Sequence, residues 1–68
     1  MEDKVVAIKS EQFRKTNKIT RISLAQKIGV SFMSVYSWEK GKTLPNADQL
    51  YQMSKILGVK MEELCQKE

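Results

Sequence analysis

The segment that most constrains the fold is TRISLAQKIGVSFMSVYSWEKGK, residues 20–42. Thr20 and Ser31 can each cap a helix start, because a hydroxyl oxygen accepts a hydrogen bond from an exposed amide of the first turn. Gly29 and Gly41 can each end a helix abruptly, because glycine readily adopts the positive φ found at many helix ends. The segment therefore predicts two short helices joined by a tight turn. Their expected bounds are residues 21–28 and 32–40.

The same segment carries most of the positive charge. Residues 14–42 hold seven basic side chains and one acidic one, Glu39, and so have a net charge of +6, whereas the whole chain of 68 residues has +4. Two short helices at this spacing are a common way to present a helix to the major groove of DNA. Because the charge lies on this motif and not on a tail, we expect double-stranded DNA as the partner.

Three further helices are expected around this pair. Pro45 disfavours a helix at the preceding residue, Asn46 can cap the next helix, and Gly58 can end it. Asp3 could cap a first helix; in the alternative interpretation that helix begins at Ser10 and the preceding VVAIK is an extended arm. We prefer the long helix, and we expect no sheet because strand and hairpin signals are weak. The expected bounds are residues 4–17, 47–57 and 60–65.

The composition excludes several classes of function. The chain has no histidine and one cysteine, so it lacks the commonest general base, a zinc-ligand set and an internal disulfide. A phosphate-binding glycine-rich loop, a signal peptide and an apolar run of roughly 20 residues are also missing. We expect a cytoplasmic protein that is not an enzyme and has no metal, cofactor, small-molecule ligand or membrane contact. So short a chain needs further stabilisation, for which dimerisation is the simplest device.

Three pieces of sequence carry a family resemblance: SLAQKIGVS, VYSWEKGKTLP and a helix that ends in ILGV. With them the chain resembles the lambda repressor-like, Cro/CI-type (XRE-like) helix-turn-helix family over residues 6–64. The matching residues are Leu24, Ala25, Gly29, Val30, Glu39, Gly41, Lys42, Pro45, Leu57, Gly58 and Val59. The resemblance implies one all-α domain over residues 1–68, with five helices and the helix-turn-helix at helices two and three. It further implies a bacterial or phage regulator of transcription, more often a repressor, that binds a two-fold operator as a homodimer.

The resemblance also implies structural roles. Arg14 and Glu39 match a partly buried, bidentate ion pair that ties the first helix to the third; the alternative is two independent surface charges. Arg21 stands where the family usually has a glutamine that holds a phosphate. The family often uses its last helix in a dimer surface. For Met61 and Leu64, closure of the monomer core is an equal alternative. These dimer candidates are Met61, Leu64 and Cys65.

The candidate DNA contacts form two groups. Because Val35 and Trp38 should face inward, the rest of the third helix is expected to be exposed. The candidate base contacts are Phe32, Met33, Ser34, Tyr36 and Ser37. The candidate phosphate contacts are Arg21, Lys40, Lys42, Asn46, Lys18 and Thr20.

Two other functions remain open. Phe32 and Met33 occupy positions where the family usually has polar base readers; they could pack on thymine methyls, cover the second helix or contact a protein. The last possibility would make the chain a protein-binding module, such as an antitoxin or antirepressor. A third interpretation is a DNA-binding fragment of a larger recombinase-like system, but we expect the chain to be complete because it starts at Met1 and ends just past the family's end.

Overall fold

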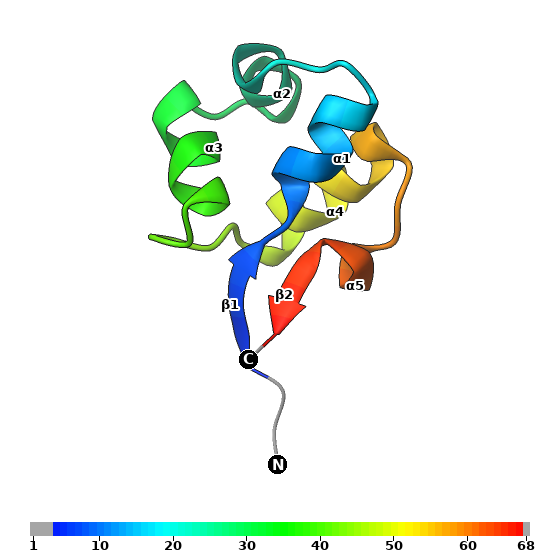
Figure 1. Cartoon of the computed structure of the whole chain (residues 1–68). Helices are drawn as coiled ribbons and strands as arrows, with labels where there is room; N and C mark the ends of the chain where they lie inside the picture. Colours follow the sequence, from blue (N-terminus) through cyan, green and yellow to red (C-terminus); the bar gives the residue numbers. More distant parts are fainter. Residues whose placement is uncertain (1–3, 68) are drawn as a thin grey trace.

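The computed structural model describes residues 4–67, which form five helices and two strands around one core. The two strands pair with each other and extend from one end of the helices, opposite α2 (Figure 1). Within residues 4–67 no helix is long and apolar enough to cross a membrane. The elements in chain order are β1 (Val5–Ile8), α1 (Ser10–Thr16), α2 (Arg21–Ile28), α3 (Phe32–Glu39), α4 (Ala47–Leu57), α5 (Met61–Leu64) and β2 (Cys65–Lys67).

Side-chain caps define where the longer helices begin. Thr20 accepts a hydrogen bond from the Ser23 amide at 3.1 Å. Asn46 and Gln49 form a reciprocal capping box, in which each side chain accepts from the other's backbone amide. As a result α2 and α4 have the bounds that the sequence predicts, and α3 ends at Glu39, one residue earlier than expected.

The N-terminal part of the chain corrects the preferred prediction. Residues 5–8 form strand β1, which pairs antiparallel with β2, and α1 begins at Ser10. The long helix over residues 4–17 is therefore wrong. The alternative is confirmed, because the first helix begins at Ser10 and residues 5–8 before it are extended. Asp3, the expected cap, lies outside the described residues. Valine and isoleucine favour extended backbone, and the C-terminal strand supplies the hydrogen-bond partners. The prediction that the chain has no sheet is wrong for the same reason, and α5 spans Met61–Leu64 instead of residues 60–65.

The core is built from one or two buried apolar residues each of β1, α2, α3, α4 and α5, whereas the buried residues of α1 are Ser10 and Arg14. Val35 and Trp38 are buried, as the helical spacing predicts, so Trp38 packs inside the core. Gly41 follows α3 with φ of +74°, and a Cβ there would lie 3.4 Å from the Val6 carbonyl oxygen. Glycine suits this position because of the positive φ, which residues with a Cβ rarely adopt. The buried apolar residues are Ile8, Leu24, Ala25, Val35, Trp38, Met53, Leu57 and Leu64.

One buried polar side chain yields a stability prediction. Ser10 is fully buried, and its hydroxyl has no hydrogen-bond partner. A buried unsatisfied hydroxyl costs about 1–3 kcal/mol, so Ser10→Ala is expected to stabilise the fold by about 1 kcal/mol. Thermal unfolding should show a melting temperature about 4–8 °C higher than that of the wild type. Ser37→Ala on α3 is the matched control, and a lower melting temperature for Ser10→Ala would mean that the hydroxyl is satisfied.

Candidate nucleic-acid interface

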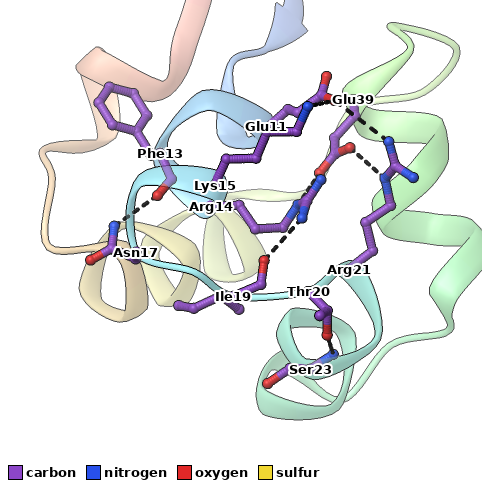
Figure 2. A network of polar contacts seen from close by, with 10 residues as sticks. All are labelled: Glu11, Phe13, Arg14, Lys15, Asn17, Ile19, Thr20, Arg21, Ser23 and Glu39. Carbon is purple, nitrogen blue, oxygen red and sulfur yellow. Dashed lines mark hydrogen bonds and ion pairs between the residues drawn. The ribbon is translucent and has the colours of Figure 1, made fainter.

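The carboxylate of Glu39, at the end of α3, joins three helices. Its side chain has no exposed surface, and each oxygen accepts one hydrogen bond from a different arginine (Figure 2). Arg14 Nε of α1 lies 2.9 Å from Oε2, and Arg21 Nε of α2 lies 2.7 Å from Oε1. Arg14 Nη1 also donates to the backbone oxygen of Ile19 at 2.9 Å. Helix α3 is thereby tied to both α1 and α2.

The structure contains the ion pair between Arg14 and Glu39, but the pair is not bidentate. The second carboxylate oxygen accepts a hydrogen bond from Arg21 instead, so one negative charge is shared by two positive ones. Arg14 is buried, whereas 27% of the Arg21 side chain is exposed. The excess positive charge of this group therefore lies at Arg21, on the solvent side.

A second acidic residue also reaches Arg21. Glu11 Oε2 of α1 lies 3.6 Å from Arg21 Nη2 and 3.1 Å from Lys15 Nζ. The hydrogen bond and charge of Lys15 hold the pKa of Glu11 below its ordinary value, and the hydrogen bond to Glu39 raises the pKa of Arg21. A lowered carboxyl pKa favours the folded state above pH 4.5, and that contribution is lost as the pH falls through the lower folded value. Glu11 was not among the predicted site residues, although its spacing of four residues from Lys15 is a signal for an ion pair.

The ring of Tyr36 on α3 is the centre of an aromatic–basic cluster. Three cations approach its centroid: the Arg21 guanidinium at 5.4 Å, Lys40 Nζ at 5.5 Å and Lys42 Nζ at 6.0 Å. The ring of Phe32 stacks against it with a centroid distance of 6.4 Å and an interplanar angle of 20°. Cations within about 6 Å of a ring face are attracted by its quadrupole, so these contacts help to hold the cations together. The cluster thus unites two candidate base contacts with three candidate phosphate contacts.

The remaining candidates on α3 differ in exposure. The Met33 residue is 59% exposed and Phe32 is 41% exposed, so neither simply covers α2. Ser37 is half-buried. The Ser34 hydroxyl lies 3.2 Å from the Ser31 hydroxyl at the helix cap, so it already has a partner within the protein.

The other candidate phosphate contacts lie at turns and helix starts. Lys18 is exposed, with a positive φ of 58° in the turn between α1 and α2. Thr20 is exposed and caps α2, where its oxygen already accepts one hydrogen bond. Asn46 uses its Oδ1 to cap α4 at 2.8 Å from the Gln49 amide, which leaves its side-chain NH₂ as the group to donate to a phosphate.

The candidate dimer residues need one correction. Leu64 is fully buried in the monomer core, because α5 closes the core with this side chain, so it does not form part of an exposed dimer surface. Met61 and Cys65 are half-buried, and the Cys65 thiol donates to the Met61 carbonyl oxygen at 3.4 Å. These two residues remain candidates for a contact with a second copy.

Comparison with known proteins identifies the class of protein. A family model described as helix-turn-helix (HTH_3) matches residues 11–64, and the chain therefore belongs to this lambda repressor-like (XRE) helix-turn-helix family. An uncharacterized HTH-type transcriptional regulator of Methanocaldococcus jannaschii is 34% identical over 56 residues, which cover 82% of this chain and 85% of that protein. The HTH-type transcriptional activator BcrR of Enterococcus faecalis is 36% identical over 56 residues, which cover 82% of this chain but only 28% of BcrR.

Solved structures show the same fold. The solution structure of the DNA-binding domain of the P22 c2 repressor has a TM-score of 0.76 and 29% identity, and the match covers 91% of this chain and 82% of that one. The crystal structure of the P22 c2 repressor in complex with synthetic operator 9T has a TM-score of 0.74 and 32% identity, with 78% and 80% covered. The chain is thus a helix-turn-helix transcriptional regulator with a repressor-like fold, and these related proteins are not enzymes.

Proposed function

We propose that the protein is a sequence-specific, double-stranded DNA-binding repressor that acts in the cytoplasm as a homodimer on a two-fold operator. The observation that carries this proposal is the aromatic–basic cluster, which gathers three cations and two aromatic rings on the exposed side of α3. In this arrangement α3 enters the major groove and α2 lies against the DNA backbone. The similarity to a repressor solved with its operator supports the proposal.

Affinity and sequence choice are expected to come from different residues. Arg21, Lys40 and Lys42 would hold phosphates, helped by Asn46, Lys18 and Thr20 near helix starts and turns. No arginine, asparagine or glutamine lies between residues 32 and 38, so the usual bidentate base readers are missing. Sequence choice would then depend on apolar contacts of the exposed side chains at the start of α3, on the hydroxyl groups of α3, and on DNA shape.

The dimer would place two copies of α3 about 34 Å apart, so that both enter the major groove on one face of the DNA. Met61 and Cys65 are the side chains through which we expect the last part of the chain to contact its second copy. The alternative of a protein-binding module receives no support from the related proteins named above, which are transcriptional regulators.

Selection of bound oligonucleotides from a random pool tests the proposal. A homodimeric repressor should enrich an inverted repeat whose half-sites are centred about one helical turn apart. Enrichment of a single unrepeated half-site would contradict the homodimer. No enrichment over the starting pool would contradict sequence-specific binding altogether.

The apolar start of α3 leads to a prediction about thymine methyl groups. If Phe32 and Met33 pack on thymine, replacement of a contacted thymine in the selected site by deoxyuridine should weaken binding roughly threefold, because only one methyl group is lost. The Phe32→Ala/Met33→Ala variant should bind thymine and deoxyuridine sites equally well. Anisotropy titrations with both duplexes check this, with a thymine outside the half-sites as control. Equal sensitivity of the wild type and the variant would contradict the assignment.

A further inference from the structure

Glu11 lies outside the helix-turn-helix, yet its carboxylate reaches Arg21. The side chain of Glu11, on α1, is 40% exposed, and its Oε2 atom lies 3.6 Å from Arg21 Nη2 (Figure 2). Residues 14–42 contain one acidic residue, Glu39, and its side chain has no exposed surface. Glu11 therefore brings an exposed negative charge to the edge of the aromatic–basic cluster.

The two carboxylates hold Arg21 unequally. The bond from Arg21 Nε to Glu39 is 2.7 Å long and its acceptor is fully shielded, whereas the contact to Glu11 is 3.6 Å long and lies between exposed groups. Exposed ion pairs of this kind are weak and exchange readily, whereas shielded hydrogen-bonded pairs persist. Arg21 is thus anchored at Nε and offers Nη2 to a partner that can be replaced.

A phosphate is a suitable replacement for that partner. A guanidinium binds carboxylate and phosphate oxygens with the same N–H groups and similar geometry, so both cannot use Nη2 fully at once. Glu11 also has room to move, because it lines an open pocket of about 400 Å³ together with Lys15 and Gln12. Lys15 Nζ, at 3.1 Å, can keep the carboxylate paired after it leaves Arg21.

We propose that Glu11 occupies the place of a DNA phosphate on Arg21 in the free protein and is displaced when DNA binds. Glu39 keeps Arg21 anchored at Nε throughout, whereas Glu11 occupies Nη2 in the free protein and lowers affinity because it must be displaced. This inference rests on the proposed function. It gives the protein a built-in competitor that limits binding to DNA of any sequence.

A double-mutant cycle on Glu11 and Arg21 tests this inference. Binding of a short labelled duplex of random sequence is measured by anisotropy at about 0.1 M salt for the wild type, Glu11→Gln, Arg21→Gln and the double variant. Glu11→Gln is expected to bind roughly twofold to fivefold more tightly than the wild type. In the Arg21→Gln background the same change should alter affinity by less than about 1.5-fold, because the competed group is gone. Glu62→Gln, on α5, is the control for removal of an exposed negative charge.

Each outcome of the cycle has a distinct meaning. A gain that depends on Arg21 supports the inference, and loss of a merely structural contact would weaken binding instead. An equal gain in both backgrounds would assign the effect to long-range charge and overturn the inference, as would no gain or a loss in Glu11→Gln. If the wild type itself fails to bind at low salt, the proposed function fails and the inference falls with it; if it binds without coupling, only the inference fails.

Discussion

Glu39→Gln is expected to leave much of the protein unfolded at physiological temperature. The substitution keeps the side-chain shape but removes the charge that two arginines share. The single amide oxygen of glutamine can accept from Arg14 or from Arg21, and the buried Arg14 is left without a countercharge. Removal of one member of a buried ion pair costs about 3–5 kcal/mol, which is similar to the whole stability expected of so short a chain. Thermal unfolding should show a melting temperature lower by roughly 10 °C or more.

Two further variants show whether the buried charge is the cause. Glu62→Gln removes an exposed carboxylate and should leave the melting temperature nearly unchanged. Arg14→Met combined with Glu39→Gln should lose less stability than the two single changes added together, because no unpaired guanidinium then stays buried. A melting temperature of Glu39→Gln close to that of the wild type would show that the tie between α1, α2 and α3 is dispensable.

Lys40→Ala/Lys42→Ala is expected to have the largest effect on DNA affinity. Both lysines are exposed beside Tyr36, so the fold should be unaffected. Each phosphate contact contributes roughly eightfold to affinity at about 0.1 M salt through counterion release, so two lost contacts should weaken binding roughly 50-fold for each protomer. The slope of log affinity against log salt should become shallower by about two for each protomer, as measured by anisotropy at several salt concentrations.

The loss should be similar for every DNA sequence, because phosphate contacts carry no direct sequence information. Lys55→Ala, on α4, is a control, since Lys55 lies over the Tyr51 ring and outside the aromatic–basic cluster. A loss confined to one operator sequence, or an unchanged salt slope, would contradict the assignment of Lys40 and Lys42 to phosphates.

Helices whose two ends are set by nearby residues were predicted correctly from the sequence. Caps and C-terminal glycines lie within a few residues of the helix ends they define, so α2 and α4 could be bounded from sequence. Strand β1 could not be predicted in this way, since its partner β2 is about sixty residues away and its hydrogen bonds depend on the folded chain. A helix that begins at residue 4 does not account for the buried position of Ser10, which in the structure is the first residue of α1.

The candidate site was predictable to a similar extent. The pairing of Arg14 with Glu39 followed from a family pattern, and the basic residues near α3 followed from charge. The second role of Arg21, as a partner of Glu39 and Glu11, depends on how three helices meet and has no local signature. The sequence therefore indicated which residues carry the charge, and the structure adds how those charges are held.

Salt dependence of DNA binding by the wild-type protein is the most direct test of the central claim that the α3 surface binds DNA. A labelled duplex of random sequence should bind at about 50 mM salt and weaken roughly a thousandfold by about 200 mM, as expected for three phosphate contacts from each of two protomers. No binding at the lower salt concentration, or binding that does not change with salt, would contradict the claim.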